Sequence, residues 1–343
     1  MSAIRSTTSS AAPAIRVGVV GCGLVGSMHA EGAHAHPSVR LVAVAAPSPA
    51  NRTRIAERFA ATPYESLDHM LQSESLDCIC VASPDQTHIG HVEAALAAGL
   101  HVFAEKPLGY SRCDAEAIAK SAETSQRFVA VNYNRRHSFG YRTAQRILNE
   151  GYCGEVRQIW IQVTDGTPPP HVALREDVVH WTLLGHHYDL IRWLGGPVAS
   201  IWATTTPVRT AGVVADLAVI FRMKSGAAAT LNVSYRDGQQ RTTERCEIVG
   251  EHGGLVVEDV SRRVIRFQSD PDHREIFQAN PFTQGDQFYV SLRDHLDAFF
   301  TRLAAGLAPE ISVEDAIHAN ALADAVILSI NTSREVAVDA AGE

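Results

Sequence analysis

The chain has 343 residues, of which 45% are hydrophobic and 20% charged, a composition typical of a globular protein and a length that suits two domains better than one core. Its 30 basic and 38 acidic residues give a formal net charge of −8, which argues against nucleic acid or an anionic membrane surface as the main partner. No apolar run approaches the roughly 20 residues that a membrane-spanning helix needs.

The first 13 residues are rich in Ser, Thr and Ala and lack the apolar block of a secretory signal. We therefore expect residues 1–13 to form a disordered tail. The six cysteines have neither the spacing of a disulfide framework nor the paired CxxC pattern of a zinc site. Buried thiols in a reducing, cytoplasmic setting are the simplest interpretation.

Apolar strands alternate with helical segments over the next 120 residues or so. The predicted strands are Ile15–Val20, Val39–Ala46, Leu76–Ser83, His101–Pro107 and Arg127–Tyr133. Nearly continuous apolar strands separated by helices are typical of a parallel sheet that is covered on both faces. The sequence thus predicts an α/β fold that begins with a doubly wound parallel sheet, in a first domain over residues 14–134.

The pattern changes after Asn134. A helix is predicted from Phe139 to Gly151, and mostly antiparallel strands with turn residues between them follow. Two helices, Ser291–Gly306 and Ser312–Ser333, end the chain. We expect a second α/β domain over residues 135–343, in which helices pack on one face of a large, mostly antiparallel sheet.

A glycine-rich turn lies between the first strand and the first helix. Gly21-x-Gly23-Leu24-Val25-Gly26 has the GxGxxG spacing in the strand–turn–helix context that makes this motif informative. The first glycine permits a tight turn, the second lets a diphosphate approach the backbone, and the third lets helix and strand pack closely. The helix N-terminus offers free N–H groups to the anion, so the turn predicts a Rossmann domain that binds a dinucleotide.

The end of the second strand bears on the choice of dinucleotide. NAD enzymes usually carry an acidic residue there for the adenosine ribose, whereas this chain has Ala46, followed by Ser48, Arg52 and Arg54. With no carboxylate to repel a 2′-phosphate and two arginines nearby, we favour NADP over NAD. The alternative is that the arginines merely solvate a helix face.

Several stretches in this order resemble the glucose–fructose oxidoreductase / inositol dehydrogenase / MocA (Gfo/Idh/MocA) family. They are "GVVGCGLVGSMH", "SPDQTHIGHVEAALAAGLHVFAEKPLGYS", "VNYNRRHS" and "HHYDLIRWLGG". The resemblance implies a Rossmann domain followed by an α/β domain with an open sheet, binding of NAD or NADP, and chemistry on a hydroxyl or ketone of a sugar, cyclitol or related polyol. It also implies self-association through the open sheet as a homodimer or homotetramer.

An apolar strand of the first domain ends on Glu105-Lys106-Pro107, and ligands of doubly wound sheets bind beyond such strand ends. The Lys106 ammonium can hydrogen-bond a substrate oxygen and stabilise a forming alkoxide. We expect burial and nearby positive charge to lower its pKa. The resemblance implies a cis Lys106–Pro107 bond, and it places Glu105 and Lys106 beside the cofactor.

The loop after the preceding strand contains Ser83, Pro84 and His88. The resemblance implies that this loop lies against the cofactor. For His88 a helix-capping or surface position is the alternative.

The second chemical stretch is in the second domain. The resemblance aligns His186 with the family's histidine and Asp189 with its final aspartate, in a pattern Asp-x-Gly-x-His-x-x-Asp. An imidazole with a pKa near 6.5 is a natural proton relay, so His186 and Lys106 are the expected acid–base pair. The chain departs from the pattern at Thr182 and Leu184, which stand where the family has Asp and Gly. Thr182 brings no charge to the substrate.

Three further residues are candidates for substrate contact, namely Asn134 and Arg135, which follow the last Rossmann strand, and Tyr235, which ends a long strand. For the neighbouring Arg136 a role in tying the two domains together is equally plausible.

Four histidines fall within 17 residues, at 171, 180, 186 and 187. They lack the i, i+4 pair of a zincin helix and a clear third ligand, so we expect no metal.

Three functions therefore remain open. The first is an NAD(P)-dependent dehydrogenase or reductase that acts on CH–OH groups. The second is a glycosidase that oxidises a sugar carbon transiently and eliminates the glycoside. The third is a cofactor-binding sensor without catalysis, which Thr182 keeps open and the presence of Lys106 and His186 disfavours. Fold alone does not decide among them.

Overall fold

The computed structural model describes residues 14–165, 184–206, 216–235, 243–268, 273–280 and 287–340. The predicted disordered tail, residues 1–13, and the Thr182 position lie outside these ranges, as do His171 and His180. Within the described ranges no helix is long and apolar enough to cross a membrane.

The first sheet has six parallel strands in the order β3-β2-β1-β4-β5-β6. Their bounds are β1 Ile15–Val20, β2 Val39–Ala45, β3 Thr62–Tyr64, β4 Cys78–Val81, β5 His101–Ala104 and β6 Val129–Val131. The predicted doubly wound Rossmann sheet is confirmed. The strand order reverses between β1 and β4, which is the switch point where such sheets open a crevice for a ligand.

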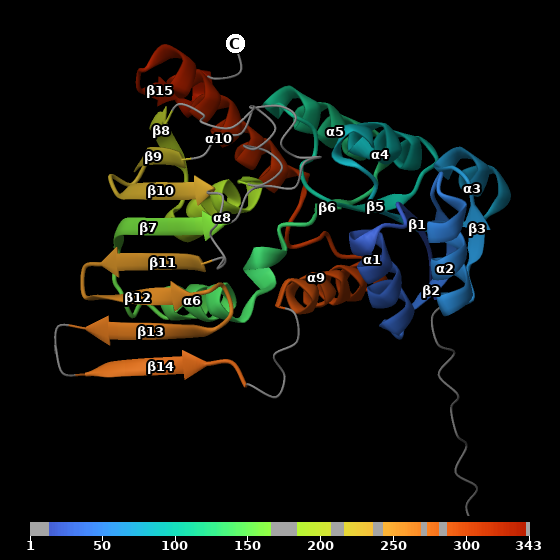
Figure 1. Cartoon of the computed structure of the whole chain (residues 1–343), viewed down its shortest axis with the longest axis horizontal. Helices are drawn as coiled ribbons and strands as arrows, with labels where there is room; N and C mark the ends of the chain where they lie inside the picture. Colours follow the sequence, from blue (N-terminus) through green and yellow to red (C-terminus); the bar gives the residue numbers. More distant parts are fainter. Residues whose placement is uncertain are drawn as a thin grey trace, which may run out of the picture.

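Helices connect these strands and cover the sheet on both faces (Figure 1). They are α1 Leu24–Ala35, α2 Pro49–Phe59, α3 Leu67–Ser73, α4 His88–Ala97 and α5 Arg112–Ser125. Serine side chains cap three of them, because the hydroxyls of Ser48, Ser66 and Ser111 accept backbone N–H bonds at the N-termini of α2, α3 and α5.

The second sheet has nine strands in the order β14-β13-β12-β11-β7-β10-β9-β8-β15, antiparallel except for the β7–β10 pair. Their bounds are β7 Val156–Asp165, β8 Val198–Thr205, β9 Asp216–Met223, β10 Ala228–Tyr235, β11 Thr243–Gly250, β12 Gly253–Glu258, β13 Arg263–Gln268, β14 Arg274–Gln278 and β15 Val336–Ala337. This large, mostly antiparallel sheet is the predicted one.

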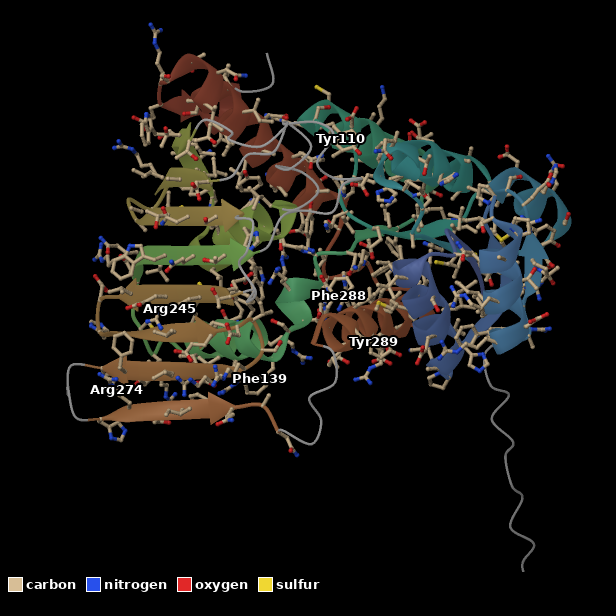
Figure 2. All side chains as sticks on the ribbon, in the orientation of Figure 1. Tyr110, Phe139, Arg245, Arg274, Phe288 and Tyr289 are labelled. Carbon is tan, nitrogen blue, oxygen red and sulfur yellow. The ribbon has the colours of Figure 1, made fainter. Side chains whose placement is uncertain are left out.

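One face of the second sheet packs against three helices, α6 Phe139–Asn149, α8 Gly185–Gly195 and α10 Val313–Thr332. The opposite face carries exposed large apolar side chains, among them Trp160, Trp202 and Ile220. Figure 2 shows the side chains of this sheet, including Arg245 of β11, on the part of the molecule remote from the first sheet. The chain passes between the two sheets through a short 3-10 helix, Asn134–His137.

A late helix returns to the first domain. α9, Gln287–Ala304, packs on α1 and lies beside it in Figure 1. Leu292, Leu296 and Phe299 of α9 join Phe103 of β5 in one buried apolar cluster. The helices approach closely at Gly32, where a Cβ would lie only 2.8 Å from a methyl carbon of Leu296. One face of the first sheet is therefore completed by residues almost 200 positions away.

Candidate active site

The glycine turn has the shape that a diphosphate needs. Gly21 has a φ of +99°, and a Cβ on it would lie 2.2 Å from the carbonyl oxygen of Ala82. A Cβ on Gly26 would lie 1.8 Å from the carbonyl oxygen of Gly21, whereas one on Gly23 would meet nothing within 4 Å. The first and third glycines are thus required for packing, and the open space above Gly23 leaves the backbone accessible.

The helix that follows the turn begins without a side-chain cap. Gly23 is the N-cap of α1, and the first turn holds no acidic residue. Gly23 and Leu24 are exposed, Leu24 by 75%. Free N–H groups at an uncovered helix N-terminus fit the diphosphate of a dinucleotide.

The end of β2 presents positive charge and no carboxylate. Ala46 is buried, and Ser48 caps α2 by accepting from the backbone N–H of Asn51 at 3.4 Å. The Arg52 guanidinium donates to the carbonyl oxygens of Ala46 and Pro47, at 3.1 and 2.9 Å. Arg54 is exposed and donates to the carbonyl of Cys22 in the glycine turn, at 3.4 Å. Both arginines thus lie where the adenosine end of a dinucleotide meets this fold.

His88 is buried and joins two loops at the carboxyl edge of the sheet. Its Nδ1 lies 2.9 Å from the carbonyl oxygen of Pro107, and its Nε2 lies 2.8 Å from that of Ser83. The Ser83 hydroxyl contacts Nδ1 of His91 at 2.9 Å, while Pro84 is exposed at the tip of the loop. His88 therefore holds the loops after β4 and β5 together from within and is not a surface residue.

Lys106 is the second residue after β5 and is half-buried, and the Lys106–Pro107 bond is cis, as the resemblance implied. Burial lowers the pKa of Lys106, the carboxylates of Glu105 and Asp85 oppose this effect, and the positive charge of Arg135 adds to it. The shift has the expected direction. An ammonium with a lowered pKa releases its proton more readily than an ordinary lysine.

His186 lies at the first turn of α8 and is buried against Tyr133, with the two ring centroids 6.1 Å apart. Burial lowers its pKa well below the usual 6.5, and the positive charges of Lys106 and Arg135 lower it further. We expected a pKa near 6.5; the structure instead holds a neutral ring. Its Nδ1 is buried and has no hydrogen-bond partner among the described residues. Lys106 and His186, from the two domains, are thus electrostatic neighbours.

Arg135 is held by a carboxylate that sequence reasoning missed. Its guanidinium lies 2.7 Å from Glu244 of β11, which also accepts from the Tyr141 hydroxyl at 2.6 Å and from Nε2 of His187 at 3.0 Å. Burial would raise the pKa of Glu244, but Arg135 and His187 outweigh it and lower the pKa to about 2. Glu244 lies 109 positions after Arg135, and no local motif marks it.

Asn134 and Arg136 both make contacts within the protein, while the side-chain oxygen of Asn134 is buried and has no hydrogen-bond partner among the described residues. The Asn134 amide donates to the Ser291 hydroxyl of α9 at 2.9 Å. Arg136 forms a buried two-pronged ion pair with Asp189 of α8 and a second ion pair with Asp315 of α10, at 2.8 Å. Arg136 therefore ties the start of the second domain to two of its helices.

Two predicted substrate residues are not placed by the structure. Thr182 lies outside the described residues. Tyr235 ends β10, where its backbone pairs with Asp165 of β7, and its side chain is not described. In the described part of the chain no group of three or more His, Cys, Asp or Glu side chains is arranged to hold a metal ion.

Comparison with known families gives matches over both domains. A model of an oxidoreductase family with an NAD-binding Rossmann fold matches residues 15–133, and a model of the GFO/IDH/MocA C-terminal domain matches residues 141–256. Together these matches span well over half of the chain.

Two relatives match over almost their whole length. Inositol 2-dehydrogenase of Rhizobium meliloti is 24% identical over 338 residues, which cover 94% of this chain and 99% of the relative. A dTDP-3,4-didehydro-2,6-dideoxy-alpha-D-glucose 3-reductase of Actinomadura kijaniata is 28% identical and covers 91% of this chain and 94% of its own.

Solved structures share the fold. The crystal structure of an oxidoreductase from Agrobacterium radiobacter in complex with NAD+, L-tartaric acid and magnesium has a TM-score of 0.86 at 20% identity, over 95% of this chain and 99% of that one.

Proposed function

The chain belongs to the Gfo/Idh/MocA family of oxidoreductases with an NAD-binding Rossmann fold, and from this premise we propose that it transfers a hydride between a nicotinamide and a carbon of a sugar, cyclitol or related polyol. The reacting group is a hydroxyl in one direction and a ketone in the other. Lys106 and His186 act as the acid–base pair.

One observation carries the proposal. Lys106, from the carboxyl end of β5, and His186, from the first turn of α8, lie close enough that the lysine's charge lowers the pKa of the imidazole. Lys106 follows β5 at the carboxyl edge of the parallel sheet, the same edge at which the glycine turn follows β1, and this supports a shared site. An amine from one domain and an imidazole from the other fit a small molecule bound between them.

The two residues have complementary roles in alcohol oxidation. A bound nicotinamide supplies the hydride acceptor. The Lys106 ammonium donates a hydrogen bond to the substrate oxygen and stabilises the alkoxide that develops as the hydride leaves carbon. His186 is neutral, so a ring nitrogen is available to accept the hydroxyl proton. In ketone reduction the same proton returns to oxygen.

The direct test is a substrate panel. Sugars, cyclitols and their keto forms are offered with NAD and with NADP, and reduced nicotinamide is followed by absorbance. We expect turnover of at least one polyol or its ketone. Cofactor binding without turnover of any substrate would support the sensor instead. Release of an aglycone without accumulation of reduced cofactor would support the glycosidase.

The charge at the end of β2 supports a preference for NADP. Arg52 and Arg54 both lie against the backbone at the adenosine end of the site, and Ala46 stands where an acidic residue would repel a 2′-phosphate. Titration of the protein with each cofactor should give a lower Kd for NADP, and Arg54→Ala should narrow the difference. Equal or tighter binding of NAD by the unmodified protein would contradict this preference.

The exposed apolar side chains on the outer face of the second sheet support self-association as a dimer or tetramer. Trp202 of β8, Ile220 of β9, Thr230 of β10 and Trp160 of β7 lie in one cross-strand row, and the two tryptophans are 40% and 42% exposed. Exposed apolar side chains that include aromatic residues and lie together on one face are typical of interfaces.

The double variant Trp160→Glu/Trp202→Glu should be monomeric by light scattering. A monomeric unmodified protein would contradict the interface.

A further inference from the structure

A line of buried polar side chains runs from α9 to the residue before Lys106. Nδ1 of His295 lies 3.0 Å from the side-chain oxygen of Asn132, and the Asn132 amide nitrogen lies 2.7 Å from Oε1 of Glu105. Nε2 of His29, from α1, approaches the same Glu105 oxygen to 2.9 Å. None of these four side chains belongs to a residue that is more than 8% exposed.

The chemistry of the groups fixes the direction of each hydrogen bond. The Glu105 carboxylate only accepts, so Asn132 and His29 both donate to it. The Asn132 amide has then used its nitrogen, and its oxygen accepts from the N–H at Nδ1 of His295. The His295 ring is neutral, because burial lowers its pKa well below the usual value and the nearby His137 and Arg136 lower it further.

The charged and titratable groups around Lys106 come from several elements. Asp85 lies in the loop after β4, Arg135 follows β6, and His186 begins α8. Glu105 is the adjacent residue and is the first of the two carboxylates that raise the pKa of Lys106 against the effect of burial. Burial would raise the pKa of Glu105 itself, but its contact with His29, the charge of Lys106 and the Asn132 amide together lower it, so the carboxylate stays charged.

Stability alone does not explain this arrangement. Burying a carboxylate with a histidine and an amide costs desolvation free energy that well-packed apolar side chains at the same positions would avoid. The surroundings are already apolar, since the Phe103 ring packs edge-on against both His29 and His295, with ring centroids 5.3 and 4.9 Å apart. The hydrogen bonds of these polar side chains end on Glu105, the residue adjacent to Lys106, so Lys106 is the functional residue that they can influence.

We propose that His295 is a positioning residue for Lys106, which acts through Asn132 and Glu105 and thereby makes α9 part of the catalytic apparatus. The proposal rests on the function proposed above. His295 fixes the orientation of the Asn132 amide, the amide fixes the Glu105 carboxylate, and the carboxylate holds a negative charge in place beside Lys106.

Two substitutions distinguish the effect of the His295 hydrogen bond from the effect of the His295 ring. His295→Phe keeps a planar ring against Phe103 and His137 and removes the donor. His295→Asn removes the ring and keeps an N–H near the position of Nδ1. The control is His36→Phe, because His36 is also buried at the α1–α9 interface and bonds Thr301 of α9 at 3.2 Å, without contact to Glu105.

The readouts are kcat, KM for substrate and cofactor, and the pH profile of kcat. For His295→Phe we expect kcat to fall about tenfold, since misplacement of a catalytic group is costly. Its cofactor KM should stay within about twofold of the unmodified value, because the glycine turn is untouched. The limb of the profile that reports Lys106 should move to lower pH, because the Glu105 carboxylate is no longer fixed beside the ammonium. His295→Asn should recover most of kcat, and His36→Phe should change neither kcat nor the profile.

The proposal is overturned if His295→Phe keeps both kcat and the pH profile, or if His295→Asn loses as much as His295→Phe. If His295→Phe does not fold, Asn132→Leu carries the same expectations, because it keeps the side-chain volume and lacks both hydrogen-bonding atoms. Lys106→Ala, measured in parallel, distinguishes failure of the proposed function from failure of the positioning role. Retained turnover in Lys106→Ala contradicts the proposed function, whereas lost turnover there with normal His295→Phe contradicts the positioning role alone.

Discussion

Each domain holds a buried histidine–glutamate pair near Lys106, and the nitrogen–oxygen distances in the two pairs are nearly the same. In the first domain Nε2 of His29 lies 2.9 Å from Glu105, and in the second Nε2 of His187 lies 3.0 Å from Glu244. Burial lowers the pKa of both histidines. For His29 the Cys80 sulfur and the Glu105 carboxylate outweigh burial and raise the pKa to about 9, whereas for His187 the net shift is downward.

The difference has two sources: Cys80 adds to Glu105 in raising the pKa of His29, and the two carboxylates have different third partners. Glu105 shares its oxygen with the neutral amide of Asn132, whereas Glu244 already has the cationic Arg135 at 2.7 Å. The positive charges of Arg135 and Lys106 also act directly against protonation of His187. A short contact to a carboxylate therefore does not by itself decide the charge of a buried histidine; the other charged and hydrogen-bonding neighbours do as well. The first pair is an ion pair, and the second is a neutral ring bonded to a salt bridge.

Removing Glu244 should produce the largest loss of stability. Glu244→Leu leaves the Arg135 charge, the His187 N–H and the Tyr141 hydroxyl without their acceptor, and we expect a cost of about 3–5 kcal/mol in the free energy of unfolding. Chemical denaturation measures it. The control Glu247→Leu, on the same strand and paired with Arg245, which is 49% exposed, should cost less than about 1 kcal/mol. Equal losses in the two variants would contradict the central place of Glu244.

The stabilisation that His29 contributes should be lost at alkaline pH, and the stabilisation that Glu244 contributes should be lost at acid pH. The pKa of His29 is raised, so its stabilisation is complete below about pH 6.5 and is lost as pH rises through about 9. The pKa of Glu244 is lowered, so its stabilisation is present above about pH 4.5 and is lost as pH falls through about 2. The His29 effect amounts to about 3 kcal/mol, at about 1.4 kcal/mol for each pKa unit.

The measurement is the free energy of unfolding as a function of pH for the unmodified protein, His29→Gln and Glu244→Gln. His29→Gln should flatten the alkaline limb, and Glu244→Gln should flatten the acid limb. An alkaline limb unchanged in His29→Gln would show that His29 is not the charged member of its pair.

Removal of the Arg135 charge tests how far Arg135 accounts for the lowered pKa of His187. Arg135→Met should raise the pKa of His187, because Glu244 then acts on the ring without a rival, and should cost about 2 kcal/mol for the lost charged hydrogen bond. NMR titration of the histidine resonances measures the pKa. A His187 resonance that titrates as in the unmodified protein would refute the explanation based on Arg135.

The smallest change in the free energy of unfolding is expected at an exposed histidine–glutamate pair. Nδ1 of His69 lies 3.1 Å from Glu65, with both side chains more than half exposed. His69→Ala should change the free energy of unfolding by no more than about 0.5 kcal/mol, because solvent screens the contact. A cost close to that of Glu244→Leu would mean that burial is not what strengthens the buried pairs.

The features that could be predicted from the sequence are those that a local pattern of residues marks. GxGxxG after an apolar strand gave the turn at Gly21, and the run of alternating strands and helices gave the doubly wound sheet. Lys106 stood out because a charged side chain ended an apolar strand. The second sheet was predicted as a large, mostly antiparallel one, although its single parallel pair, β7 with β10, leaves no local signal.

The partners of these residues lie far away in the chain and have no motif. His295 meets Asn132 across 163 positions, and Asp315 meets Arg136 across 179. Such contacts depend on the path by which α9 and α10 return to the first domain, and local periodicity carries no information about that path. Histidine charge is equally hidden, because it depends on neighbours such as Arg135 and Cys80 that folding brings together.

The most direct measurement concerns the chemical step at Lys106. Single-turnover reduction of bound cofactor by a saturating substrate is followed by stopped flow in the unmodified protein and in Lys106→Met. The account predicts a fall of about 10²-fold or more in the hydride-transfer rate, with the cofactor Kd within about twofold, because the glycine turn that cradles the diphosphate is intact. A variant rate within a few-fold of the unmodified protein would contradict the assignment of Lys106 to the reacting oxygen.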